Sequence, residues 1–167
     1  MGDSVPLAYF ITFRTYGTWL HGDERGAVDR FHNYYGTPWI PPDQDWRTRN
    51  ERILNHDPVT LTDSQRNSID HAIRQTCEMR SWLLRALNVR TNHVHVVLSA
   101  DSNHPDRILN ALKANSTSRL RNDRDWSRVS SPWSEGGSKR YVWTEVGLER
   151  VIDYVVNGQD GPVPKLD

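Results

Sequence analysis

Two histidines on either side of a valine are the residues of this sequence best suited to metal chemistry. His93 and His95 are two positions apart, and residues two apart on a β-strand project from the same face. Two neighbouring neutral imidazoles can supply half of the ligands of a divalent metal ion. The alternative is a pair of surface histidines on an edge strand, which this short pattern does not exclude.

A tyrosine in the last apolar segment is the second candidate. At about 100° per residue of helix, Tyr154 lies about 120° from the middle of the apolar stripe, on the side that also carries Arg150 and Asn157. The position alone favours a ring packed at the rim of the helix. The stripe itself consists of Leu148, Val151, Ile152 and Val155.

Two amide side chains follow this tyrosine, on either side of Gly158. Asn157 and Gln159 each offer a carbonyl oxygen, a ligand type that suits Mg²⁺ or Mn²⁺. Their structural alternative is to end the helix, because glycine and asparagine are common at helix C-termini.

Basic side chains gather before this segment. They could contact phosphates, but Asp123 and Asp125 lie among them, so a solvated surface is at least as good an interpretation. The run consists of Lys113, Arg119, Arg121, Arg124 and Arg128.

The elements that must position these residues follow from apolar spacing and from helix start signals. Thr62 and Gln65 form a capping box, and Pro105 is a good first residue of a helix. The order βαββαβα predicts an α+β, ferredoxin-like (split βαβ) antiparallel sheet with an added C-terminal helix that carries Tyr154. One sheet face is expected to be covered by helices and the other to be free. The expected strands are 8–15, 82–89, 93–99 and 140–143, and the expected helices begin near 62, 105 and 144 and the last ends at 158.

Length and composition limit the remaining possibilities. The 167 residues predict a single domain over 1–167, with a long insertion at about 17–58 that is rich in glycine, proline and aromatic residues. A single cysteine, Cys77, excludes an internal disulfide. No apolar run is long enough to span a membrane, and the N-terminus lacks a signal-peptide pattern, so we expect a cytoplasmic protein without a membrane partner.

The net charge is zero, from 21 basic and 21 acidic side chains. This balance argues against a globally basic nucleic-acid-binding protein. However, residues 64–150 carry 14 basic and nine acidic side chains, so one region has a clear positive excess.

Taken together, these motifs resemble the Y1 transposases, the single-tyrosine HUH nucleases of the IS200/IS605 and REP-associated type. The resemblance covers nearly the whole chain except about 17–58, and that long segment is more similar to the REP-associated branch. The matching segments are the opening strand 9–15, Asn92–Leu98 with the two histidines, Leu112–Leu120, Trp133–Trp143, and Val151–Val155 with the tyrosine.

The resemblance implies an enzyme that cleaves and rejoins single-stranded DNA beside a hairpin. Tyr154 would be the nucleophile and form a 5′-phosphotyrosine, while His93 and His95 would hold Mg²⁺ or Mn²⁺. Many relatives have the third ligand where this chain has Gly158. We therefore expect Gln159 in that role, with Asn157 as the alternative. Both monomers and homodimers with tyrosines acting in trans occur in the family. The implied DNA contacts are Lys113, Arg119, Arg121, Arg140 and Arg150.

Two other functions remain open at this point. The first is a catalytically silent module that binds structured single-stranded DNA or RNA on the same fold. The central strands show no aromatic RNP-type signature, and a binding module does not need His93, His95 and Tyr154 together. The second, weaker alternative is a metal-dependent phosphohydrolase in which Tyr154 has no role.

Overall fold

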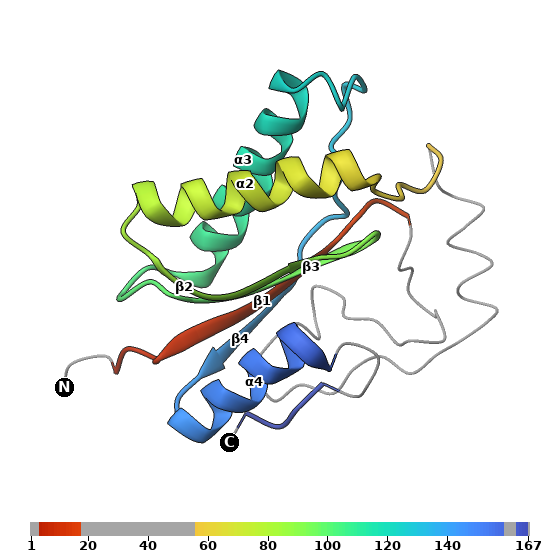
Figure 1. Ribbon diagram of the computed structural model, residues 1–167. Helices are drawn as coiled ribbons and strands as arrows, with labels where there is room; N and C mark the ends of the chain where they lie inside the picture. Colours follow the sequence, from red (N-terminus) through yellow and green to blue (C-terminus); the bar gives the residue numbers. More distant parts are fainter. Residues whose placement is uncertain (1–3, 18–55, 159–162, 167) are drawn as a thin grey trace.

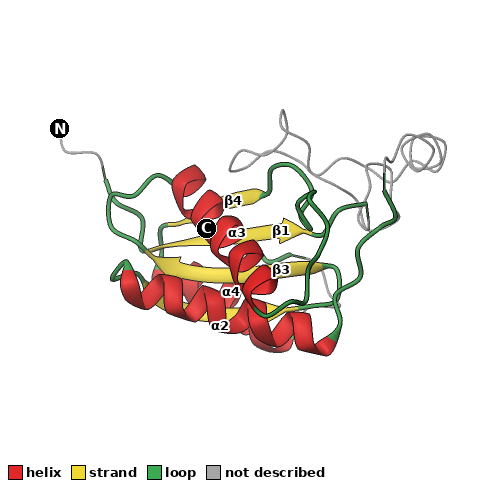
Figure 2. Ribbon diagram, turned by 90° about the horizontal axis from the view of Figure 1, so that it is seen from above, coloured by secondary structure: helices red, strands yellow, loops and turns green. Residues whose placement is uncertain are grey.

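A computed structural model describes residues 4–17, 56–158 and 163–166. Its four strands form one antiparallel sheet in the order β2-β3-β1-β4, and Figure 2 shows β1 between β3 and β4. This arrangement confirms the predicted ferredoxin-like fold. The elements are β1 (Ala8–Arg14), α2 (Asp63–Met79), β2 (Leu83–Val89), β3 (His93–Ser99), α3 (Pro105–Asn122), β4 (Ser138–Val142) and α4 (Glu145–Asn157).

Helices cover both faces of the sheet. Helices α2 and α3 lie on one face, and α4 lies on the opposite face (Figure 1). The expectation that one face would be free is therefore wrong. The physical reason is that α4 has an apolar stripe that must itself be buried, and the second sheet face is where it packs.

Alternation along β1 divides the apolar residues between two cores. Tyr9, Ile11 and Phe13 point into the core shared with α2 and α3. Ala8 and Phe10 point into a smaller core under α4. This is the two-residue period of a strand buried on both faces.

The ends of the helices follow the signals in the sequence. The Thr62 side chain accepts a hydrogen bond from the Gln65 backbone, and the Gln65 side chain accepts one from the Thr62 backbone. Such a cap typically contributes about 1 kcal/mol to the free energy of unfolding. Pro105 is the first residue of α3, while Thr144 caps the start of α4 and Gly158 follows its end.

The C-terminal segment 163–166 returns to the start of α4. Leu166 is only 1% exposed and belongs to the core under this helix. A Cβ atom on Gly147 would lie 2.1 Å from the Leu166 carbonyl oxygen, so the close approach requires glycine. The tail therefore helps to hold α4 on its own sheet.

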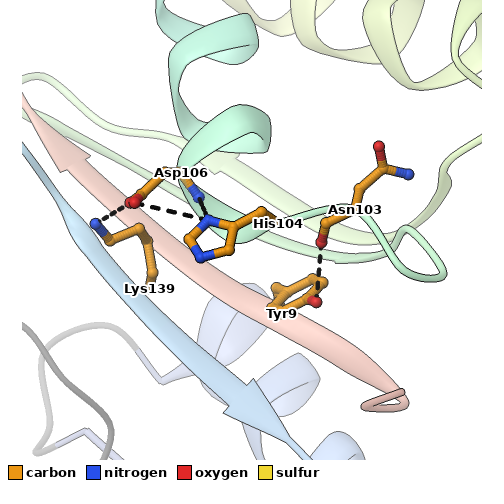
Figure 3. A network of polar contacts seen from close by, with 5 residues as sticks. All are labelled: Tyr9, Asn103, His104, Asp106 and Lys139. Atoms are coloured by element: carbon orange, nitrogen blue, oxygen red, sulfur yellow. Dashed lines mark hydrogen bonds and ion pairs between the residues drawn. The ribbon is translucent and has the colours of Figure 1, made fainter. Parts of the chain in front are cut away.

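A polar network joins the start of α3 to two strands (Figure 3). Asp106 pairs with Lys139 of β4 and lies 3.6 Å from the His104 ring nitrogen Nδ1. The Tyr9 hydroxyl donates to the Asn103 carbonyl at 3.0 Å. These contacts fix the start of α3 over β1 and β4, on the face opposite to α4.

Two expectations about the rest of the chain remain predictions. Most of the insertion at about 17–58 lies outside the described residues, as does Gln159. Within the described part of the chain, every helix is too short or too polar to cross a bilayer.

Candidate active site

The two histidines lie on a central strand. On β3, Val94 and Val96 point into the core under α2 and α3, so alternation turns His93 and His95 toward the face of α4. Their ring centroids are 4.6 Å apart, with an angle of 73° between the rings. His95 is only 3% exposed, and His93 is half-buried. The predicted common face is confirmed, and the pair does not lie on an edge strand.

Helix α4 brings Tyr154 to the same face. The ring of Tyr154 is half-buried, with its centroid 5.6 Å from that of His95 and 6.1 Å from that of Phe10. The Asn88 side chain, on β2, donates to the Val155 carbonyl at 3.1 Å. Strand and helix together thus place a phenol beside two imidazoles.

This position combines the two interpretations of Tyr154. The ring packs at the edge of the apolar stripe, against the core under α4. It also contacts His95. The position of Tyr154 at the rim of the helix is therefore compatible with a catalytic role, because this rim faces the histidine pair.

Each imidazole is held through its Nδ1 atom by a side-chain oxygen. His93 Nδ1 lies 2.7 Å from Asn92 Oδ1. His95 Nδ1 lies 2.7 Å from Thr12 Oγ1 on β1, and Thr12 is the residue opposite His95 in the strand register. Both oxygens lie close enough for ordinary hydrogen bonds.

Burial keeps His95 uncharged at neutral pH. Its pKa is lowered from 6.5 to about 3, first by burial and then by the positive charges of His93 and Arg90. Only the neutral imidazole has a lone pair to give to a metal ion. His95 therefore meets that requirement over the whole physiological pH range.

The donor set fits part of a divalent metal site. Two imidazole nitrogens are common ligands, and a hard ion such as Mg²⁺ or Mn²⁺ would add oxygen ligands from amides, phosphate or water. Among the described residues, no three His, Cys, Asp or Glu side chains form a metal-binding group. Asn157 is exposed, and its amide donates to Asp153 at 2.9 Å; Gln159 lies outside the described residues.

The predicted DNA contacts divide between the two faces. Arg140 lies opposite Phe10 in the β1–β4 register, so it is on the histidine face. Arg150 is exposed on α4, one turn before Tyr154. Lys113, Arg119 and Arg121 belong to α3, on the other face (Figure 1).

The three basic residues of α3 have contacts within the protein. Lys113 Nζ donates to the carbonyl oxygens of Ser134 and Gly136. Its pKa is lowered to about 8, mainly by burial, then by Arg14 and Lys139, while Glu135 acts in the opposite direction. Arg119 forms an ion pair with Asp123 at 2.9 Å, and Arg121 donates to the Val129 carbonyl at 3.0 Å.

Sequence reasoning did not identify Thr12 or Arg14 as site residues. Thr12 is a buried polar residue on a strand whose preceding residues are all apolar or aromatic, and this unusual placement is the signal that could have found it. Arg14 lies opposite His93 in the strand register. Both assignments depend on which residues of β1 lie opposite which residues of β3, and the sequence alone does not specify this register.

Comparisons with known proteins agree with this architecture. The structure is similar to that of a candidate transposase from Deinococcus radiodurans R1, with a TM-score of 0.52, 15% identity and 95% of each chain covered. It is also similar to a REP-associated tyrosine transposase bound to a REP hairpin, with a TM-score of 0.52 and 12% identity over 93% of this chain and 70% of that one. At such low identity these likenesses show the fold.

The sequence comparison identifies the family. No curated protein sequence matches significantly. A family model described as "Transposase IS200 like" matches residues 54–157, which is more than half of the chain and includes both histidines and the tyrosine. By this match, the chain belongs to the IS200-like transposase family.

Proposed function

We propose that this protein is a metal-dependent endonuclease and strand transferase that acts on single-stranded DNA beside a hairpin. The observation that carries the proposal is the contact between Tyr154 and His95, with His93 next to it. A phenol and two imidazoles from distant parts of the chain meet at one place. The hairpin-bound REP-associated neighbour supports a hairpin as the DNA partner.

In the proposed reaction, the Tyr154 hydroxyl loses its proton and attacks a phosphodiester. A bond forms between the tyrosine oxygen and phosphorus, and the bond from phosphorus to the upstream O3′ breaks. The leaving oxygen takes up a proton and becomes a free 3′-OH, while the 5′ end stays on the enzyme as a phosphotyrosine. Because a phosphoester replaces a phosphoester, a 3′-OH can reverse the step without ATP.

His93 and His95 would hold the divalent ion. When bound, Mg²⁺ or Mn²⁺ would polarise the scissile phosphate and offset the charge that develops on it. The remaining ligands would include Gln159, or Asn157 in its place. Packing against Phe10 and His95 orients the Tyr154 ring before DNA binds. The entropy cost of positioning the hydroxyl is therefore already met in the free protein.

Arg140 and Arg150 are the proposed phosphate contacts near the tyrosine. Both lie on the α4 side of the molecule. Lys113, Arg119 and Arg121 remain candidate contacts for parts of a hairpin that reach around to α3. The DNA strand at Tyr154 does not meet them directly, because the sheet separates the two faces.

The first prediction concerns the nucleophile. Replacement of Tyr154 by phenylalanine keeps the ring and its packing but removes the hydroxyl. We expect binding of hairpin DNA to remain and cleavage to fall by roughly 10³-fold or more, as for other lost nucleophiles. The measurement uses hairpin oligonucleotides from the DNA flanking the gene, labelled at both ends, and detects an adduct that resists SDS.

Tyr141→Phe is the matched control, because Tyr141 packs against Tyr9 on the face covered by α2 and α3. It should form the adduct as the wild type does, and EDTA should abolish adducts in both proteins. Cleavage by Tyr154→Phe would contradict the mechanism. Tight binding by the wild type without an adduct would instead favour the silent binding module.

A further inference from the structure

The two imidazoles of the site share one feature that the proposed reaction does not explain. In each ring, a side-chain oxygen lies 2.7 Å from Nδ1. The oxygens come from separate places, the turn before β3 for Asn92 and the middle of β1 for Thr12. Two independent contacts therefore occupy the same atom, Nδ1, in both rings.

We propose that Asn92 and Thr12 are positioning residues that fix the proton of each imidazole on Nδ1 and so leave Nε2 of both rings as the metal-binding atoms. The inference rests on the proposed function, because it assigns how the histidine pair of that site would bind its ion. It concerns atoms of this chain and can be tested on the protein without metal.

For His93 the tautomer follows from the partner. The Asn92 side-chain oxygen is a carbonyl oxygen and can only accept a hydrogen bond. His93 Nδ1 must therefore donate, and in a neutral ring the lone pair then belongs to Nε2. Asn92 is itself held, because its backbone carbonyl accepts from the Thr15 amide at 2.9 Å and from the Thr15 hydroxyl at 3.1 Å.

For His95 the partner permits both directions, because a threonine hydroxyl can donate or accept. If Thr12 accepts, Nε2 carries the lone pair, as in His93. If Thr12 donates, Nε2 carries the proton and cannot bind a metal. The first arrangement is the one that makes two equivalent ligands, and metal-bound histidines usually donate their other N–H to such a partner.

Burial explains why these contacts would matter for His95. The ring is almost fully enclosed, so water cannot easily replace Thr12 at Nδ1. Loss of the threonine hydroxyl would leave a buried polar atom without its partner, which is costly. Removal of a comparable contact behind a metal-binding histidine typically weakens metal binding by about 10- to 100-fold.

A purely structural role is the competing explanation. Thr12 could simply satisfy a buried histidine in the folded protein, whichever nitrogen carries the proton. The position of the proton separates the two, because long-range ¹H–¹⁵N spectra of ¹⁵N-histidine show which ring nitrogen is protonated. The sequence has seven histidines, and His93→Gln and His95→Gln assign the two signals by their loss.

The test begins with the metal-free wild type at pH 7.5, followed by titration with Mn²⁺ alone. We expect protons on Nδ1 of both His93 and His95. Thr12→Val should scramble the His95 tautomer and weaken Mn²⁺ binding by about 10- to 100-fold. Thr12→Ser keeps a hydroxyl and should restore both properties. For His93, Asn92→Ala removes the acceptor oxygen and should have the effects of Thr12→Val. Asn92→Asp keeps an acceptor oxygen and should behave as Thr12→Ser does.

Thr76→Val is the control for the loss of a buried threonine hydroxyl. Thr76 is buried on α2, where its hydroxyl donates to the Ala72 carbonyl at 2.7 Å. It is on the opposite face from the histidines, so Thr76→Val should lower stability without changing either tautomer or the affinity for Mn²⁺.

Two results would overturn the inference. One is a proton on Nε2 of either histidine in the metal-free wild type, which needs no variant to fold. The other is a Thr12→Val protein with unchanged tautomer and unchanged Mn²⁺ affinity. Failure of the proposed function looks different: both tautomers are as expected and Mn²⁺ binds, but no DNA adduct forms on Tyr154.

Discussion

His95 is the residue at which burial and positive charge act together. Its pKa is about 3 in the folded protein, against 6.5 for an ordinary histidine. The charged groups nearby act in the same direction, since His93 and Arg90 both disfavour a proton on this ring. Arg14 adds a cation opposite His93, and Tyr154 contributes its ring from α4. The fold thus excludes the imidazolium form.

Because the pKa of His95 is lowered, the free energy of unfolding of the metal-free protein should decrease as the pH falls. Between pH 6.5 and about 3, the unfolded chain binds a proton at His95 that the folded protein does not. Stability is therefore fully present above pH 6.5 and falls as the pH is lowered, by up to about 1.4 kcal/mol per pH unit for this proton. Urea unfolding at pH 7.5, 6.0 and 5.0 measures the slope.

His95→Gln provides the comparison, because glutamine does not titrate. Its free energy of unfolding should change less between pH 7.5 and 5.0 than that of the wild type, whatever its absolute stability. Parallel curves for the two proteins would show that His95 binds its proton equally well in the folded and unfolded states, contrary to the lowered pKa.

At the element scale, the boundaries set by local signals were predictable. The capping box at Thr62, the proline that starts α3 and the glycine after α4 act within a few residues of chain. The spacing of His93 and His95 also fixed their common face, because strand alternation is local. These signals were enough to give the fold class.

Features that depend on pairing between distant segments were not predictable in the same way. The sequence gives no register between β1 and β3, so the contact of Thr12 with His95 could not be read from it. The expectation of a free sheet face is wrong, because the apolar stripe of α4 shows that this side of the helix must be buried but does not show which surface covers it. Both are consequences of tertiary packing, which local patterns do not specify.

The division of basic residues between the faces leads to a prediction for DNA binding. Arg140 lies on the histidine face, so Arg140→Gln should reduce the salt dependence of binding by about 0.7 to 0.9 in log–log slope for one lost phosphate contact. It should also slow cleavage at saturating DNA. Binding at several salt concentrations and single-turnover cleavage provide the two measurements.

Arg119→Gln is the counterpart on α3, where Arg119 pairs with Asp123. If a hairpin reaches α3, this change can lower affinity and salt slope, but cleavage at saturating DNA should stay at the wild-type rate. An equal loss of cleavage rate in both variants would contradict the assignment of the reacting strand to the α4 face.

The whole molecule is neutral, so its approach to DNA cannot depend on total charge. The positive excess lies in residues 64–150, which form most of the sheet and the helices around it. Helix α4 links the fold to the proposed reaction, because it carries Tyr154 and also covers the second core.

From the attachment of α4 we predict that, in the proposed reaction, Tyr154 works with the histidines of its own chain. Val151, Val155 and Leu166 are almost fully buried under or beside this helix, and Asn88 holds its last turn. For α4 to exchange between two copies, it would first have to leave this core and expose the apolar surface, at about 25 cal/mol for each Å². We therefore expect no activity from a mixture of Tyr154→Phe with His93→Ala, each inactive alone.

The mixture is assayed by adduct formation on hairpin DNA, after incubation of both variants at high concentration. A mixture of wild type with Tyr154→Phe shows whether the inactive chain interferes, and its adduct yield should simply follow the amount of wild type. Restored adduct in the first mixture would mean that a tyrosine reaches the histidines of another copy. In that event the core under α4 must open during the reaction, and substitution of Leu166 by alanine should then increase the exchange.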